Sequence, residues 1–175
     1  MEETAQGKKA LILGRGGFGV TLGELLAANG YTEVAFLDDA ATGCVGMLED
    51  YRRPELRAAY PYAFVGIGSN ALRAGLLQKL AAAGYETPVF VHPAAAVSPS
   101  AVLGAGTVVL PFAYVGAGAA LGGGCIINAG AIIDHGAVLG LGAHAAPGSI
   151  VKAGAAVPDY AKVESGEIVH SPWEK

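Results

Sequence analysis

From Val97 onward the sequence divides into groups of six residues, which read VSPSAV, LGAGTV, VLPFAY, VGAGAA, LGGGCI, INAGAI, IDHGAV, LGLGAH, AAPGSI, VKAGAA, VPDYAK and VESGEI, ending at Ile168. The first position of each group is Val, Leu or Ile, except at Ala145, and the fifth position is small until Glu167. A short, fixed period of one branched aliphatic and one small residue is typical of a parallel β-helix. Each group then supplies one short strand, the aliphatic side chain fills the interior, and the small residue allows a tight corner.

Three groups of six should make one triangular coil, so that residues eighteen apart in the sequence stack on one another. About four such coils bury a continuous core. The spacing does not fix the handedness of the coil. Its flat sides leave apolar faces that packing three copies together would bury, so we expect a homotrimer. The composition changes near residue 90, which predicts two domains, 1–90 and 91–175.

Ionisable side chains are almost absent from the repeat. Between His92 and Val151 there is no Lys, Arg or Glu, and the only carboxylate is Asp134. A neutral imidazole, with a usual pKa of about 6.5, can accept a proton at cellular pH. His135 is therefore the leading candidate for a catalytic base, with His144 as the second histidine of interest. The alternative interpretation makes both of them surface residues or interface hydrogen-bonding groups.

Other chemistry is less well supported by the sequence. Hexad-repeat carbonic anhydrases bind zinc through three histidines at subunit interfaces, but the separations here do not match theirs, and we predict no metal. His92 is interpreted as a structural residue and His170 as a solvated one. The two cysteines, Cys44 and Cys125, are too few for a disulfide framework, and Cys125 occupies a small interior position. We expect both to be reduced, with no nucleophilic role.

The overall composition excludes several classes of protein. The chain has 15 acidic and 11 basic side chains, a net charge of −4 and no apolar run long enough to span a bilayer. Its N-terminus lacks the layout of a signal peptide, so a cytoplasmic location is expected. No basic cluster is present, which makes nucleic acid an unsuitable partner.

The first half begins with a pattern that is typical of nucleotide-binding units. A short apolar strand, residues 9–13, runs into a glycine turn, and apolar residues at helical spacing follow until Gly30. In a strand–turn–helix unit the glycines allow a tight turn, a close approach of the ligand and close packing of helix on strand. The N–H groups at the start of the helix would face a pyrophosphate. The candidate binding residues in the turn are Gly14, Gly16, Gly17, Phe18 and Gly19.

Polar residues follow the next two predicted strands. Asp38 and Asp39 end the second strand, where a carboxylate can hold a ribose hydroxyl or a base N–H, and Ser69 and Asn70 follow the third. About three strands make a unit too small to grip a complete dinucleotide, so a mononucleotide or nucleotide sugar is favoured over NAD. The alternative is a glycine turn that only packs a helix.

With both halves considered, the chain resembles the sugar acyltransferases typified by sialic acid O-acetyltransferase and PglD-like bacillosamine N-acetyltransferase. The resemblance covers nearly all of the chain. It rests on the glycine turn at 14–19, the Phe36-Leu37-Asp38-Asp39 segment, Gly66 to Asn70 with Arg73, and Ile127-Asn128 through His135 to His144. It implies a Rossmann-like N-terminal domain that holds the nucleotide part of a UDP-amino-sugar, followed by a left-handed β-helix that forms a trimer and binds acetyl-CoA between neighbouring coils.

The resemblance also implies roles for individual residues. His135 would be the general base, His144 would lie near the acetyl group, and Asn128 would lie close to the substrate. Where the family has an acidic residue after the catalytic histidine, this chain has Gly136. Asp134 precedes the histidine, but alternation along a strand would direct its side chain to the opposite face.

The coil is also short after His144 compared with longer relatives. Lys152 and Lys162 are the cations left to meet coenzyme A phosphates, and Lys152 is a candidate donor-binding residue.

Together these features predict an acetyl-CoA-dependent acyltransferase that modifies an amine or a hydroxyl of a sugar. Such an activity can be measured as the release of free thiol from acetyl-CoA. One alternative is a non-catalytic trimer that binds a nucleotide sugar as a sensor or scaffold. Another, based on the glycine turn alone, is an NAD-dependent oxidoreductase, which leaves the hexad repeat unexplained.

Overall fold

The computed structural model describes residues 7–171 and 173. Its internal contacts group the chain into two compact units. The first contains the residues up to Gly68 together with Leu76–Thr87, and the second contains Ser69–Gly75 together with the chain from Pro88 onward. The first turn of one helix therefore groups with the second half of the sequence. The domain limits expected from composition, 1–90 and 91–175, stay a prediction.

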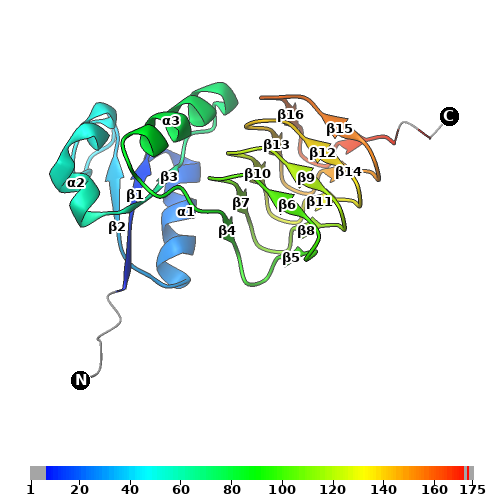
Figure 1. The fold of residues 1–175 in the computed structure, drawn as a ribbon, viewed down its shortest axis with the longest axis horizontal. Helices are drawn as coiled ribbons and strands as arrows, with labels where there is room; N and C mark the ends of the chain where they lie inside the picture. Colours follow the sequence, from blue (N-terminus) through cyan, green and yellow to red (C-terminus); the bar gives the residue numbers. More distant parts are fainter. Residues whose placement is uncertain (1–6, 172, 174–175) are drawn as a thin grey trace, which may run out of the picture. The chain divides into compact units, whose positions relative to one another are not determined.

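The first unit is built on a parallel sheet of three strands in the order β2-β1-β3 (Figure 1). The strands are β1 (Lys8–Leu13), β2 (Tyr31–Leu37) and β3 (Tyr62–Val65). Helix α1 (Gly17–Ala28) connects β1 to β2, and α3 (Asn70–Ala82) follows β3. Residues 10–13 of the central strand are fully buried, as expected for a parallel strand covered on both faces.

Two short helices in this unit are absent from the sequence-based interpretation. They are the 3-10 helix η1 (Leu48–Arg52) and α2 (Pro54–Ala59). Pro54 at the first position of α2 suits a helix start, because that position needs no N–H donor and favours the fixed φ of proline. Six residues are too few to show a helical period, which explains why the pattern did not reveal α2.

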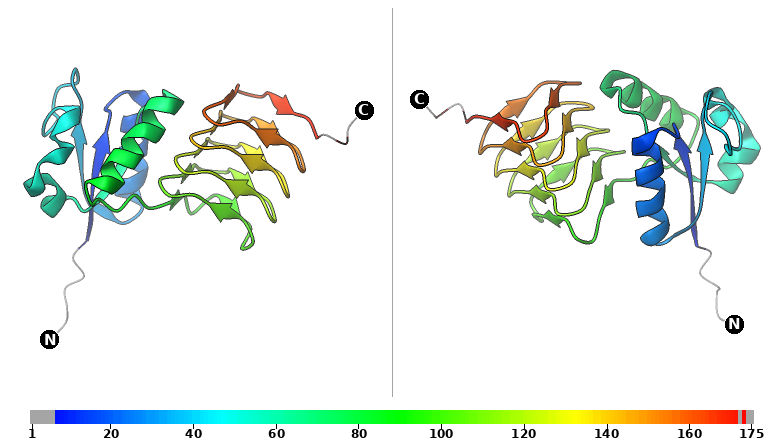
Figure 2. Two further views of the ribbon diagram at one scale, coloured as in Figure 1. Left: turned by 45° about the horizontal axis from the view of Figure 1, so that its top comes forward. Right: turned by 180° about the vertical axis from the view of Figure 1, so that it is seen from behind.

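The second unit is a parallel β-helix, as the repeat predicts. Two-residue strands stack in three sheets, one for each side of the triangle (Figures 1 and 2). The first sheet contains β4 (Phe90–Val91), β7 (Val108–Val109), β10 (Ile126–Ile127), β13 (His144–Ala145) and β16 (Lys162–Val163). The second contains β5 (Ala96–Val97), β8 (Tyr114–Val115), β11 (Ile132–Ile133), β14 (Ile150–Val151) and β17 (Ile168–Val169). The third contains β6 (Val102–Leu103), β9 (Ala120–Leu121), β12 (Val138–Leu139) and β15 (Ala156–Val157).

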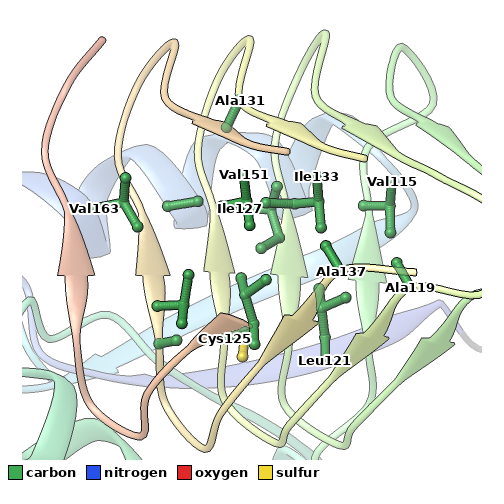
Figure 3. Packing of buried hydrophobic residues seen from close by; sticks show 14 of the residues in the cluster. Val115, Ala119, Leu121, Cys125, Ile127, Ala131, Ile133, Ala137, Val151 and Val163 are labelled. Atoms are coloured by element: carbon green, nitrogen blue, oxygen red, sulfur yellow. The ribbon is translucent and has the colours of Figure 1, made fainter. Parts of the chain in front are cut away.

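Paired strands are offset by one coil of eighteen residues, as between Ile126 and His144. The interior is filled by the aliphatic first positions and the small fifth positions of each group (Figure 3). Cys125 is one of these small interior residues and is fully buried. The aromatic side chains of Phe112, Tyr114 and Tyr160 are exposed, because the narrow interior of the coil has no room for large rings.

Most corners of the coil carry a glycine with positive φ, a conformation that costs other residues more. Phe112 and Tyr160 adopt the same conformation, with φ of 63° and 58°. The corners therefore keep one geometry along the whole coil, and a residue's position in its group of six determines whether it lies in a strand or at a corner.

Candidate active site

The glycine turn follows β1 directly and uses its glycines in two ways. Gly14 has a φ of +95°, and a Cβ at Gly19 would collide with the carbonyl oxygen of Gly14. These two positions need glycine for the shape of the turn. A Cβ at Gly16 or Gly17 would meet nothing within 4 Å, so both border open space. Helix α1 begins at Gly17 without a side-chain cap or an acidic residue in its first turn. Its first N–H groups are suited to an anion.

The carboxylate of Asp38 lies against this turn. Its Oδ2 accepts a hydrogen bond of 2.7 Å from the backbone N–H of Arg15, and its Oδ1 accepts bonds from the N–H groups of Ala40 and Ala41. These bonds, with that from Arg15 the largest cause, lower the pKa of Asp38. Asp39 is held differently, because its Oδ1 accepts from the N–H of Leu48. The two acidic residues thus fix the loop after β2, and Asp38 joins it to the glycine turn.

The structure groups Ser69 and Asn70 with the coil. The side-chain amide of Asn70 donates to the carbonyl oxygens of Tyr160 and Ala161, at 2.9 and 3.2 Å. Ser69 is exposed, and its carbonyl accepts from the N–H of Arg73 in the first turn of α3. Asn70 therefore braces the start of α3 against the coil, and a nucleotide-binding role for either residue stays a prediction.

Arg73 is the residue that sequence reasoning undervalued. Its side chain is only 2% exposed. The guanidinium donates to the carbonyl oxygens of Gly124 and Gly142, at 2.8 and 2.6 Å, and to Oδ1 of Asn70 at 2.8 Å. Burial lowers the pKa of Arg73 to about 10. A full positive charge is thus held by main-chain carbonyl groups at the same corner of two successive coils, which no pattern of side chains could reveal.

His144 and Asn128 are brought together on the first sheet of the coil. The amide nitrogen of Asn128 lies 3.3 Å from Nε2 of His144, so the ring nitrogen accepts and Nδ1 carries the hydrogen. Burial lowers the pKa of His144 to about 4, and the positive charges of Arg73 and Lys162 act in the same direction. His144 is therefore neutral at cellular pH and too weak a base to take a proton there; it is suited to hydrogen bonding.

His135 lies in a different setting, at an open corner between β11 and β12. Its side chain is 68% exposed, and Nδ1 lies 2.9 Å from Oδ1 of Asp134. A carboxylate only accepts hydrogen bonds, so Nδ1 carries the hydrogen and Nε2 keeps a free lone pair. The geometry of a general base is present: one ring nitrogen is anchored and the other faces outward.

The contact with Asp134 corrects the expectation that this carboxylate points away from the histidine. Strand β11 ends at Ile133, so Asp134 and His135 lie in the turn, where the alternation of side chains no longer applies. The same Oδ1 accepts the backbone N–H of His135 at 2.7 Å. This bond, the contact with the imidazole and a bond from the N–H of Ala153 lower the pKa of Asp134. Asp134 is therefore a firmly held carboxylate, although Gly136 carries no acid.

The two candidate histidines face different sides of the coil. His135 follows β11, His144 opens β13, and β12 of a third sheet separates them. Ala145 faces the interior, so the preceding His144 faces outward from the first sheet, whereas His135 lies at the corner between the other two sheets. One chain therefore does not place both imidazoles around a single group. A site that uses both would need two copies of the coil.

The remaining candidates are simpler to place. Lys152 is half-buried directly after β14. Cys125 donates from Sγ to the carbonyl of Gly140, and burial raises its pKa to about 11, which leaves an unreactive thiol. Within residues 7–171 and 173, no group of three or more potential metal ligands occurs. Over the same residues, no helix has the length and apolar character needed to cross a bilayer.

Comparisons with known proteins agree with this architecture. A family model for the PglD N-terminal domain matches residues 9–80. A UDP-N-acetylbacillosamine N-acetyltransferase of Bacillus subtilis (strain 168) is 35% identical over 111 residues, which are 59% of this chain and 51% of that protein. The chain thus spans about half the length of this curated relative.

Two solved structures match over most of their length. The acetyltransferase domain of PglB from Neisseria gonorrhoeae FA1090 is 29% identical, with a TM-score of 0.83 over 93% of this chain and 91% of that one. PerB from Caulobacter crescentus, in complex with CoA and GDP-perosamine, is 31% identical, with a TM-score of 0.78 over 93% of this chain and 88% of that one.

A Rossmann-like α/β unit followed by a left-handed parallel β-helix is the fold that these matches share with the chain. The chain belongs to the PglD-like sugar acetyltransferases, the family that its motifs resemble.

Proposed function

We propose that this protein transfers the acetyl group of acetyl-CoA to an amine of a nucleotide-linked sugar. The observation that carries the proposal is the exposed imidazole of His135, with Nδ1 bonded to Asp134 and Nε2 open at a corner of the coil. The relatives support the chemistry, since PerB binds CoA and GDP-perosamine and the PglB domain binds acetyl coenzyme A. Their names favour an amine over a hydroxyl as acceptor.

In the proposed reaction, Nε2 of His135 takes a proton from the sugar amine while the amine nitrogen bonds to the thioester carbonyl carbon. The tetrahedral intermediate then collapses, the carbon–sulfur bond breaks and the thiolate receives the proton. General base catalysis of this kind contributes about 10²–10⁴-fold to the rate. Asp134 would keep the imidazole in the tautomer that leaves Nε2 unprotonated. No covalent enzyme intermediate is needed, in line with the buried thiol of Cys125.

His144 fits a second role in the same reaction. It is neutral at cellular pH, and its Nδ1–H can donate to the acetyl group without competing for the proton. Because His135 and His144 of one chain face different sides of the coil, we infer that each complete site combines two neighbouring copies. Three copies around an axis would form three equal sites, which supports the predicted homotrimer.

We further propose that the glycine turn binds the diphosphate of the nucleotide sugar. Gly16 and Gly17 border open space at the start of α1, and Asp38 is held beside the turn. The names of the relatives include one UDP-linked and one GDP-linked sugar, so experiment must determine which nucleobase the substrate of this protein carries. A cytoplasmic location stays a prediction.

The test is release of free thiol from acetyl-CoA in the presence of UDP-, CMP- and GDP-linked amino sugars. The wild type should release thiol with one acceptor, and His135→Ala should lower the rate at least 100-fold. His170→Ala, a change of another exposed histidine, is the matched control and should keep the wild-type rate. Nucleotide-sugar binding without thiol release for any acceptor would instead favour a non-catalytic sensor or scaffold.

A further inference from the structure

The described end of the chain brings an aromatic side chain to the corner of the coil that carries His135. Trp173 is the only tryptophan of the sequence and is 73% exposed. Its indole packs directly on Gly154, where a Cβ would lie 2.6 Å from Cζ3 and 3.0 Å from Cζ2. The contact is possible only because Gly154 has no side chain. The backbone N–H of Trp173 also donates to Oγ of the buried Ser171 at 3.3 Å, which anchors the residue.

Gly154 and His135 occupy neighbouring coils at the same corner. The N–H of Gly154 donates to the carbonyl oxygen of His135 at 3.1 Å. Strands that pair in this way are about 4.8 Å apart. The indole of Trp173 therefore rests on the coil next to that of the proposed base, on the side toward the C-terminus.

The rest of this corner offers little surface to a ligand. On the coil of His135 and the two coils next to it, the other residues at these two corner positions carry only hydrogen atoms or methyl groups as side chains; they are Ala117, Gly118, Gly136, Ala153 and Gly154. Such residues cannot donate hydrogen bonds from their side chains to the hydroxyls of a sugar. The indole is consequently the one large, flat and mainly apolar surface among the described residues of this corner.

We propose that the indole of Trp173 forms a wall of the acyl-donor site and packs against the pantetheine arm of acetyl-CoA. The inference rests on the proposed function, which brings the thioester carbonyl beside Nε2 of His135. The pantetheine arm starts at the thioester sulfur, so its first groups lie within one or two coil spacings of the base. Its methylene and dimethyl groups suit a flat aromatic face, whereas the adenine lies at the far end of the arm.

The experiment compares Trp173→Ala and Trp173→Phe with two donors, acetyl-CoA and acetyl-pantetheine, which lacks the adenosine part. Trp173→Ala should raise KM about tenfold for both donors, as expected for loss of an aromatic contact. The acceptor KM and kcat should change less than threefold, and Trp173→Phe should keep most of the donor affinity. Phe112→Ala removes another exposed aromatic side chain from a different corner and should change nothing.

The single tryptophan also gives a readout that does not depend on turnover. Addition of pantetheine or CoA to the wild type should change the indole emission, whereas adenosine 3′,5′-bisphosphate should leave it unchanged. This titration separates the two proposals. If the indole emission responds to pantetheine but the protein releases no thiol, the result contradicts the proposed function and supports the contact between Trp173 and pantetheine.

Three results would overturn the proposal that Trp173 forms a wall of the acyl-donor site. They are a donor KM that is unchanged in Trp173→Ala, a rise with acetyl-CoA alone, and a rise in the acceptor KM alone. If Trp173→Ala fails to fold, the emission titration of the wild type decides, and an indole that responds to neither CoA nor pantetheine refutes the assignment.

Discussion

Replacement of Asp134 measures how much its carboxylate contributes to the proposed reaction by orienting the imidazole of His135. In Asp134→Ala the imidazole of His135 loses its partner at 2.9 Å and can rotate or exchange tautomers. A hydrogen bond to a charged group is worth about 1.5–3 kcal/mol in a buried setting. Here the two side chains are 68% and 41% exposed, so water screens the pair and the contribution falls to the lower limit of that range or slightly below it. About 1–1.5 kcal/mol corresponds to a fall in kcat of roughly tenfold.

The assay is thiol release at saturating concentrations of both substrates. Asp134→Ala should lower kcat about tenfold, with KM values unchanged, against the much larger loss expected for His135→Ala. Asp134→Ala/Gly136→Asp restores an acid on the other side of the histidine and should recover part of the rate. Asp is among the residues that tolerate the positive φ of 65° found at Gly136. An unchanged kcat in Asp134→Ala, or no recovery in a folded double variant, would refute the orienting role.

Three further predictions concern the scaffold of the site. Arg73→Met leaves the carbonyl oxygens of Gly124 and Gly142 without their buried donor and should lower stability by about 3 kcal/mol, or roughly 6–12 °C in Tm by circular dichroism; a shift below 2 °C would contradict the buried network. Gly19→Ala should lower Tm because its Cβ meets the Gly14 carbonyl, whereas Gly16→Ala should keep Tm within about 2 °C and weaken nucleotide-sugar binding about tenfold or more in calorimetry. Equal Tm losses in the two variants would argue against this division of the turn. His144 has a folded pKa of about 4, below the 6.5 of an unfolded histidine, so the unfolded state binds more protons between these values. Its contribution to stability is complete above pH 6.5 and is lost as the pH falls toward 4, by up to about 3 kcal/mol; His144→Gln should flatten this part of the denaturation profile, and an unaltered profile would contradict the shift.

The coil could be predicted almost completely from the sequence, because its period is local and each position has one geometric role. Cys125 illustrates this: its place in the group of six alone predicts a buried, unreactive thiol. The strand–turn–helix start was equally accessible, since Gly14 and Gly19 mark where the backbone needs positive φ or close approach.

Contacts that depend on the main chain were beyond the sequence. Arg73 is held by carbonyl groups, which every residue carries, so no partner could be read from residue types. Asp134 was expected to point away because the strand was assumed to continue, while β11 ends one residue earlier. The roles of His135, His144, Asn128, Lys152 and the nucleotide-binding residues stay predictions. The geometry does distinguish an exposed imidazole anchored by Asp134 from a partly buried, neutral, hydrogen-bonding histidine.

The offset of one coil between paired strands limits how a protein of this design can change in length. Ile126 pairs with His144, eighteen residues away, and the same offset links Val108 with Ile126. Gain or loss of one coil elsewhere leaves every later residue on its original side, and only moves it along the axis. Gain or loss of a single group of six would rotate everything after it by one side of the triangle, so that His144 would leave the side it shares with Arg73. Viable insertions should therefore come in multiples of eighteen residues, since only these keep His135 and His144 on their original sides of the triangle.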